Sequence, residues 1–450
     1  MSALALLARR RGVAVTGCDK DANGAGGAAA AADVRRAGGQ VLAGHDPSHV
    51  EAARAVVVSS AVPPDHPELI RARELGLPVV RRAEALAAAV SSGQVVAVAG
   101  THGKTTTTVM ATEALAAAGL SPTGIAGGRV SAWGGNARLG GDNLFIVEAD
   151  EYDKSFLALT PQVAVINNVE PDHLECYGSV EALEEAFSRF PHSARRLIVG
   201  GDDPAALRVA RASGRPTWTV GFAEEADFRV QVVERNPGGS VAVVRTPAGR
   251  QVELRVKVPG IHNVRNASAA LAVCVELGAE LEPVLGALAG FGGVGRRFEM
   301  VGEAAGVVVI DDYAHHEGEI AATLDAARQA YPERRLVAVF QPHLFSRTAE
   351  HGVAMGRALA AADMVVVTDI YAAREKPLPG VSGRMVQEAA EIAGADSRWV
   401  PVRDELAPYL AGVVRSGDLV VTMGAGDVTW VGRELIGLLG KAEGGGGAAS

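Results

Sequence analysis

The chain has little cysteine and no long apolar run. Only three cysteines, Cys18, Cys176 and Cys274, occur among 450 residues. An odd number of widely spaced cysteines provides neither a disulfide framework nor a paired metal motif, and it fits a reducing cytosol. No apolar run approaches the roughly 18–20 residues that a membrane span requires. The basic cluster near Met1 follows the apolar residues, which is the reverse of a secretory signal. We therefore expect a cytoplasmic protein with no membrane partner.

Positive charge is also scarce. The 43 Lys and Arg residues are outnumbered by 52 Asp and Glu residues, which gives a net charge of −9. This balance argues against a nucleic-acid partner, and phosphate groups would need local positive sites. Hydrophobic residues make up 48% of the chain, which is enough for sizeable cores. The length predicts about three domains.

One stretch, VVAVAGTHGKTTTT over residues 95–108, joins an apolar run to a glycine turn and then to Lys104 and Thr105. The apolar run predicts a buried strand, and the threonine-rich residues after it predict a helix. This context is typical of a phosphate-binding loop, in which the lysine reaches the outer phosphates and the threonine hydroxyl can hold Mg²⁺. Gly100 lies closer to Gly103 than in the common motif, so the loop is a tight variant. An ordinary strand-to-helix turn is the alternative.

Acidic and histidine side chains follow two further apolar runs that predict strands. The first run ends in Glu148 and Asp150, and the second leads to Asp172 and His173. In open α/β sheets, ligands bind beyond the carboxyl ends of the strands, so we expect these side chains near Lys104. Carboxylates there can hold Mg²⁺, and a histidine can take a second metal ion. Solvated acids and a capping histidine are the alternatives.

Later segments add polar residues with two interpretations each. His262, Asn263 and Asn266 surround a predicted helix start, where they either cap the helix or contact a base or ribose. Arg296 and Arg297 can neutralise charge on a transferring phosphoryl group, or form surface salt bridges.

Three more candidates follow predicted strands in the last third of the chain. They are Tyr313, His315 and Arg347. The arginine is suited to holding a carboxylate through two parallel hydrogen bonds.

The alternation of predicted strands and helices favours an α/β fold with three domains, over residues 1–93, 94–293 and 294–450. We expect Rossmann-like N-terminal and C-terminal domains. The central domain is expected to combine a parallel sheet that carries the P-loop with a small antiparallel sheet over residues 227–258. Because the chain opens inside a predicted helix, we expect the first domain to lack its first strand and glycine-rich loop.

Eight motifs occur in a fixed order along nearly the whole chain: GTHGKTTT, EADEYDKSF, NNVEPDHLECYG, GIHNVRNASAA, GRRFE, DDYAHH, QPHLFSRT and GAGDV. Together they resemble the Mur ligase family. The resemblance implies a UDP-sugar domain, a central ATPase domain and a C-terminal amino-acid domain. It also implies a reaction of peptidoglycan synthesis, in which ATP phosphorylates the lactyl carboxylate of UDP-N-acetylmuramate and L-alanine attacks the acyl phosphate. A peptide-recycling ligase of the same family and a nucleotide-binding protein without ligase activity are the alternatives.

The resemblance also implies a set of site residues. The catalytic residues would be Lys104, His173 and Arg297. ATP would be bound by Gly100, Thr101, His102, Gly103, Lys104, Thr105, Thr106, His262, Asn263, Asn266, Arg297 and Asp311. Mg²⁺ would be held by Thr105, Glu148 and His173. L-alanine would contact Tyr313, His315 and Arg347, and the UDP-sugar would contact Ser60. The family usually has a proline where Glu317 stands, a change expected to alter only a helix start. We expect a monomer or weak homodimer.

Overall fold

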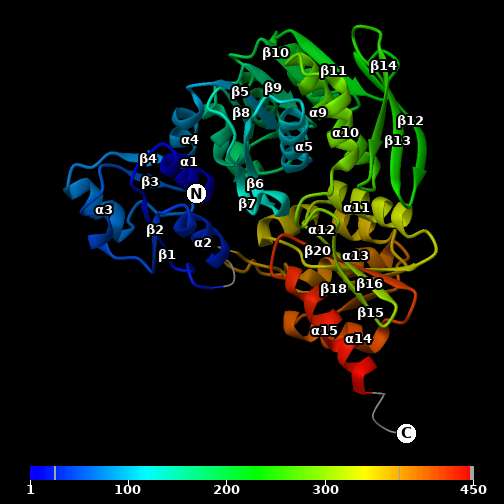
Figure 1. Cartoon of the computed structure of the whole chain (residues 1–450). Coiled ribbons are helices and arrows are strands. Elements are labelled where there is room, and N and C mark those ends of the chain that lie inside the picture. The colour runs from blue at the N-terminus through cyan, green and yellow to red at the C-terminus, as the bar shows by residue number, and fades with distance from the viewer. Residues whose placement is uncertain (25–26, 374, 446–450) are drawn as a thin grey trace. The chain divides into compact units, whose positions relative to one another are not determined.

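The computed structural model describes residues 1–24, 27–373 and 375–445 (Figure 1). The chain divides into two compact units. The first comprises residues 1–231, 243–254 and 265–289, and the second comprises residues 232–242, 255–264 and those from 290 onward. The expected first domain and most of the expected central domain therefore share one unit.

The N-terminal part carries small parallel strand pairs rather than one continuous sheet. Strand β1 pairs with β2, and β3 pairs with β4, both in parallel. The apolar run at residues 55–60 predicts a buried strand, but β3 is only three residues long and partly exposed, and it pairs with β4 in a two-stranded sheet. The elements are α1 (Ser2–Arg10), β1 (Thr16–Asp19), α2 (Ala28–Arg36), β2 (Gln40–Ala43), η1 (Pro47–Val50), β3 (Val56–Val58), α3 (Pro67–Glu74), β4 (Val79–Arg81) and α4 (Arg82–Val90).

A ten-stranded sheet forms the centre of the chain, in the order β14-β13-β12-β11-β10-β9-β5-β8-β6-β7. In this order, each pair of neighbouring strands between β12 and β6 is parallel. Strand β7 pairs antiparallel to β6 at one edge of the sheet. The expected hairpin strands continue this sheet, since β12 is hydrogen-bonded to β11. The strands are β5 (Gln94–Ala99), β6 (Thr123–Val130), β7 (Gly135–Arg138), β8 (Leu144–Glu148), β9 (Val163–Ile166), β10 (Arg196–Gly200), β11 (Thr217–Gly221), β12 (Phe228–Asn236), β13 (Gly239–Arg245) and β14 (Gln251–Val256).

Helices and short 3₁₀ turns connect these strands. They are α5 (Lys104–Ala117), η2 (Ser131–Trp133), η3 (Tyr152–Ala158), α6 (Leu174–Tyr177), α7 (Val180–Arg189), α8 (Pro204–Ser213), α9 (Ile261–Glu276) and α10 (Leu281–Gly290). In the sequence, Gly119 predicts the end of this helix, and α5 ends two residues before it. Gly119 adopts a φ of 84°, its N–H donates to Ala116, and the N–H of Leu120 donates to Leu115. This left-handed glycine closes the helix.

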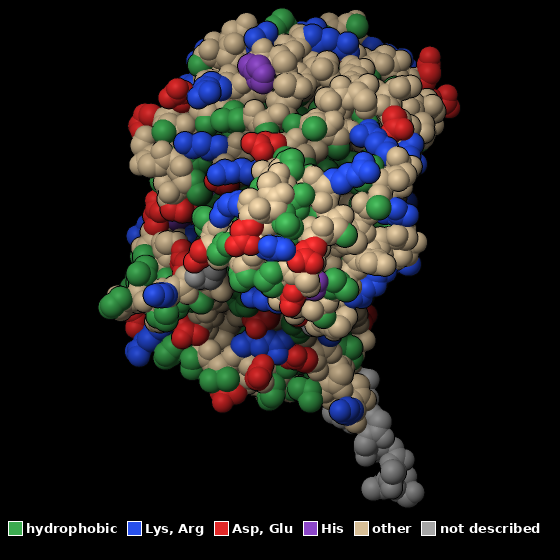
Figure 2. Space-filling model, turned by 90° about the vertical axis from the view of Figure 1, so that its left-hand side faces the viewer, with side chains coloured by type: hydrophobic (Ala, Val, Ile, Leu, Met, Phe, Trp, Pro, Cys, Tyr) green, Lys and Arg blue, Asp and Glu red, His purple; other side chains and the backbone are tan. Residues whose placement is uncertain are grey.

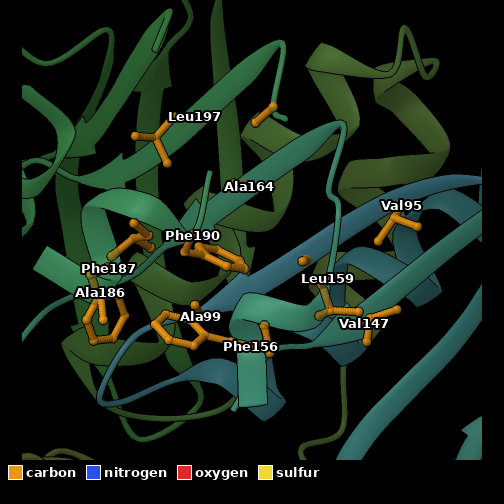
Figure 3. Close-up of a cluster of buried hydrophobic side chains, with 14 of the residues drawn as sticks. Val95, Ala99, Val147, Phe156, Leu159, Ala164, Ala186, Phe187, Phe190 and Leu197 are labelled. Carbon is orange, nitrogen blue, oxygen red and sulfur yellow. The ribbon is translucent and has the colours of Figure 1, made fainter. Parts of the chain in front are cut away.

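One hydrophobic cluster fixes the segment that follows β8 (Figure 3). Phe156, on η3, stacks on Phe190 and meets Phe187 edge-on, with ring centroids 5.1 Å apart in both pairs. Aromatic pairs in these arrangements add to the stabilisation that burial gives. The turn between β8 and η3, which contains Glu151, is thereby anchored against the core.

The second unit contains a six-stranded sheet in the order β15-β16-β20-β17-β18-β19, with only β15 antiparallel. Hydrophobic clusters cover both of its faces. The strands are β15 (Glu299–Ala304), β16 (Val307–Asp312), β17 (Arg335–Phe340), β18 (Met364–Val367), β19 (Ser397–Trp399) and β20 (Asp418–Met423). The helices are α11 (Glu317–Ala330), α12 (Phe345–Leu359), α13 (Gly383–Ile392), η4 (Arg403–Glu405), α14 (Leu406–Val413) and α15 (Thr429–Gly445). Apolar runs in the sequence predict strands β16, β17, β18 and β20, whereas β15 and β19 contain no such run and were missed.

Acidic and basic side chains are interspersed over the face of the molecule in Figure 2. Among the helices of the described residues, none has both the length and the apolar character needed to cross a membrane.

Candidate active site

The phosphate-loop candidate lies between β5 and α5, as the sequence predicts. Gly103 is the N-cap of α5 with a φ of 79°, and Thr105 and Thr106 occupy the first helical turn. A Cβ on Gly103 would lie 2.3 Å from Oδ1 of Asn266 on α9. Only glycine fits both the left-handed backbone and this close approach, so the start of α5 remains open to an anion.

Lys104 is largely buried and is held in place by three acceptors. Its ammonium donates to the carbonyl oxygens of Gly100 (2.7 Å) and Thr101 (3.0 Å), and to Oε1 of Glu151 (2.9 Å). Burial by itself would lower the pKa of Lys104, but the neighbouring carboxylates, Glu151 foremost, raise it above its usual value. The lysine is therefore charged at neutral pH and aimed at the loop.

Glu151 was missed by the sequence reasoning. It is 2% exposed, follows Asp150 by one residue, and has its backbone carbonyl bonded to the Tyr177 hydroxyl. The available signal was the group of acids at positions 148, 150 and 151. This pattern does not indicate which acid contacts Lys104, because the conformation of the turn after β8 determines the direction of each side chain.

Glu148 is the partly buried acid at the end of β8. Burial raises its pKa, while hydrogen bonds from the Gly127 N–H (2.6 Å) and the Thr105 hydroxyl favour the carboxylate. A Cβ on Gly127 would lie 2.5 Å from the carboxylate, so the approach of β6 depends on glycine. This oxygen donor, next to a threonine hydroxyl, suits Mg²⁺, which prefers such ligands.

Polar residues after β9 hold the loop from the other side. The amide of Asn167 donates to the carbonyl of His102 (3.2 Å) and to the hydroxyl of Thr107 (3.1 Å). Oδ1 of Asn168 accepts from the His102 N–H (2.7 Å), and the Thr101 hydroxyl accepts from the Glu170 N–H (2.8 Å). The sequence predicts a strand over residues 163–168 but assigns no role to Asn167 or Asn168.

His173 lies at the start of α6 with a φ of 56°. Its ring meets the Tyr152 ring edge-on at 5.1 Å, and it lies 3.6 Å from Asp172 and 3.5 Å from Glu175. A histidine flanked by carboxylates can serve as a metal ligand. The predicted role of His173 as a ligand of Mg²⁺ stays a prediction.

A separate pocket of about 160 Å³ lies in the same unit. Its lining includes Ser60, Arg81, Arg82, Asp153 and Lys154. The predicted sugar-binding residue thus lies in a cavity that also contains three cationic side chains.

In the second unit, predicted residues gather around the Tyr313 ring. The guanidinium groups of Arg296 and Arg297 lie 4.9 Å and 5.2 Å from its centroid. Arg297 also donates to Glu319 (3.3 Å). Asp311 is buried and accepts from Arg296, from Thr422 and from Thr429. Its predicted contact with the nucleotide is not tested by these bonds.

The two remaining candidates for the amino acid are linked through a histidine that was not predicted as a site residue. The ring of His315 lies 5.2 Å from Tyr313 and 6.1 Å from His343. Nδ1 of His343 lies 3.3 Å from Arg347 Nη1. The structure therefore brings Tyr313, His315 and Arg347 into one connected group.

The residues predicted around the start of α9 divide between the units. Asn263, in the second unit, donates to the carbonyl of Pro259 (2.7 Å) and lies 3.0 Å from His262 Nε2. Asn266, in the first unit, accepts from the Thr107 hydroxyl at 3.3 Å. Asn266 therefore lies against the start of α5, and the predicted nucleotide contacts of His262, Asn263 and Asn266 stay predictions.

Three Mur ligase family models match the chain: the family catalytic domain at residues 1–93, the middle domain at 98–274 and the glutamate ligase domain at 296–426. A UDP-N-acetylmuramate–L-alanine ligase of Kineococcus radiotolerans is 46% identical, covering 98% of this chain and 94% of its own. One from Streptomyces coelicolor is 45% identical, with coverage of 98% and 96%.

Solved structures show the same likeness. The UDP-N-acetylmuramate-alanine ligase of Thermotoga maritima is 29% identical with a TM-score of 0.83, covering 99% of this chain and 97% of its own. A murein peptide ligase of Psychrobacter arcticus, 24% identical with a TM-score of 0.71, covers 98% and 96% and shares the fold. On the strength of relatives that match it from end to end, the chain belongs to the Mur ligase family and has its three-domain α/β fold.

Proposed function

We propose that this protein joins L-alanine to the lactyl carboxylate of UDP-N-acetylmuramate in the cytoplasm, with conversion of ATP to ADP and phosphate, as a step of peptidoglycan synthesis. The observation that carries this proposal is the identity of about 45% along the chain with ligases named for these substrates. The geometry of the phosphate loop agrees with it.

The chemistry follows from the carboxylate's poor reactivity towards an amine. A lactyl carboxylate oxygen attacks the terminal phosphorus of ATP, and ADP leaves. The amine of alanine then attacks the acyl carbon, phosphate leaves, and the ammonium proton is lost to give an amide. Lys104 and the N-terminus of α5 offset the negative charge that develops on the transferring group.

Mg²⁺ bound at the loop would offset further phosphate charge. Glu148 and Thr105 offer adjacent oxygen donors for it, and His173 is our proposed ligand for a second ion. Glu148 is partly buried, lies near the charged Lys104 and receives its hydrogen bonds from neutral donors. The carboxylate of Glu148 is therefore suited to binding a cation such as Mg²⁺.

The amino acid is assigned to the second unit. We assign the carboxylate of L-alanine to Arg347, whose guanidinium can hold it through two parallel hydrogen bonds, with Tyr313 and His315 beside it. We assign the UDP-sugar to the pocket that contains Ser60, because Arg81, Arg82 and Lys154 would attract its phosphates.

The decisive experiment is ADP release measured against a panel of amino acids and the recycled tripeptide, with and without UDP-N-acetylmuramate. We expect release only when the nucleotide sugar and L-alanine are both present. Dependence on the tripeptide would identify a recycling ligase, and release without any acceptor a plain ATPase. ATP binding without release would indicate a protein that has lost ligase activity.

A further inference from the structure

A cluster of metal-binding side chains lies in the N-terminal part of the first unit, away from the residues assigned above. Cys18 is on β1, and His45 follows β2. His66 is the N-cap of α3, and Glu68 is in its first turn. Glu68 is 7% exposed, and its carboxylate lies next to the side chains of Cys18, His45 and His66.

The donor atoms already have the spacing of a metal site. Sγ of Cys18 lies 3.0 Å from both oxygens of Glu68, and Nδ1 of His45 lies 3.4 Å from this sulfur and 3.6 Å from Glu68 Oε2. Donors bound to one tetrahedral zinc at about 2.0–2.3 Å stand roughly 3.3–3.7 Å from one another. Little movement is needed for all three to reach one ion.

A further histidine lies beside these three donors. Nδ1 of His66 is buried without a hydrogen-bond partner among the described residues and lies 3.9 Å from Glu68 Oε2. Its ring meets that of His45 edge-on at 4.6 Å. Burying a polar nitrogen without a partner is unfavourable, and a metal ion would satisfy it.

The surroundings orient the carboxylate. Oε1 of Glu68 lies 2.9 Å from Nδ1 of His49 and accepts from the Asp46 N–H at 3.1 Å. Outer hydrogen bonds of this kind fix ligands in place and commonly strengthen metal binding. His45 is one-third exposed, which leaves a route for an ion to enter.

The donor set selects the metal. Thiolate and imidazole ligands favour zinc over magnesium, which prefers oxygen. We propose that Cys18, His45 and Glu68 bind a zinc ion, with His66 as fourth ligand, and that the ion ties β1, the segment after β2 and the start of α3 together. This site is independent of the Mg²⁺ proposed at the phosphate loop.

Binding must displace the proton of the thiol. Burial and the hydrogen bond to Glu68 raise the pKa of Cys18 to about 12, so the metal-free cysteine is a thiol. Zinc binding forms the S–Zn bond and releases this proton to solvent, which makes the affinity rise with pH.

Cobalt(II) is the probe for this site, because a cobalt–thiolate bond gives a charge-transfer absorption in the near ultraviolet. The chelator-treated full-length chain is titrated with Co²⁺ without ATP, Mg²⁺ or substrates. We expect one equivalent to give the band and Zn²⁺ to abolish it. Cys18→Ser should lose the band, whereas Cys176→Ser, the matched control at the other half-buried cysteine, should keep it.

Two more variants separate binding from misfolding. His45→Gln should weaken Co²⁺ binding at least about a hundredfold, and His49→Ala by about tenfold to a hundredfold, with circular dichroism unchanged. A wild-type protein without the band, or a band that survives Cys18→Ser, would overturn the proposal. Neither result affects the proposed ligase reaction, because the titration contains none of its substrates.

Discussion

At the scale of single residues, the site is built around a lysine that is charged although it is largely buried. Desolvation alone would favour the neutral amine, and the carboxylates around Lys104 reverse this preference. The lysine also uses two backbone carbonyls of its own loop, so its position follows from the loop conformation. A preorganised charge of this kind needs no rearrangement when the phosphoryl group becomes more negative.

Replacing Lys104 by alanine removes this charge. Loss of one such contact typically costs about 3–4 kcal/mol in the transition state, so we expect turnover in the ADP-release assay to fall at least about a hundredfold. Lys257→Ala, at an exposed position of the second unit, is the control and should turn over normally. Near-normal turnover of Lys104→Ala would reject the assignment of the loop.

Glu151 gives a prediction about pH. Glu151→Gln keeps the size of the side chain but removes the nearest of the charges that raise the pKa of Lys104, so that pKa should fall. The enzyme then loses the charged lysine at a lower pH, and the alkaline limb of the profile of kcat against pH should move to lower pH. An alkaline limb identical to that of the wild type would show that Glu151 does not control this charge.

At the scale of elements, the loop depends on how closely α9 approaches the start of α5. In Gly103→Ala the added Cβ meets Asn266, and the residue must keep a left-handed backbone that costs roughly 1–2 kcal/mol. We expect the dissociation constant for a non-hydrolysable ATP analogue, measured by calorimetry, to rise at least about tenfold.

Gly119→Ala at the other end of α5 is the matched control. It has a similar φ of 84°, but no atom of the described part of the chain lies within 4 Å of the added Cβ. This variant should lose stability through the same backbone strain while binding the analogue as tightly as the wild type. If both variants weaken binding equally, the contact with Asn266 is not the cause.

Elements whose pattern is local could be predicted from the sequence. Strands β5, β8 and β9 are continuous apolar runs, and α5 begins and ends at glycines, so periodicity and breakers sufficed. Strand β6 was missed because three glycines in residues 123–130 lower its strand propensity. It forms because it pairs with β8 and packs on α5, and this information is not local.

The same limit applies to the site. The sequence identified Lys104, Thr105 and Glu148 because they directly follow strand and turn signals. Glu151 and Asn167 act through long-range contacts, and the Cys18 cluster joins segments up to 50 residues apart. Composition and spacing do not encode such distances.

At the scale of the whole molecule, the residues assigned to ATP and to alanine divide between two compact units, so each unit's stability matters to the reaction. In the second unit Asp312 ends β16 beside the residues assigned to alanine. It is 6% exposed, and its two oxygens accept from the N–H groups of Phe298 (2.7 Å) and Ala314 (2.8 Å). Burial outweighs these bonds and the nearby Arg297, and raises the pKa of Asp312 to about 6.

This shift makes the second unit's stability depend on pH in an unusual direction. The carboxyl pKa is 3.8 in the unfolded chain and about 6 in the folded one. Between these values the folded state holds a proton that the unfolded state has lost, so this group's contribution to stability falls as pH rises and is lowest above pH 6. The difference between the two limits is roughly 3 kcal/mol.

Asp312→Asn removes the titration, at the constant cost of one acceptor for a backbone N–H. Urea unfolding at several pH values between 4 and 6.5, followed by tryptophan fluorescence, gives the free energy of unfolding of both proteins. We expect the wild type to lose stability relative to Asp312→Asn as pH rises through this window, since only the wild type must then bury a charge. Asp404→Asn, whose side chain is 85% exposed, should run parallel to the wild type. A difference between wild type and Asp312→Asn that stays constant with pH would mean that the buried carboxyl ionises alike in both states.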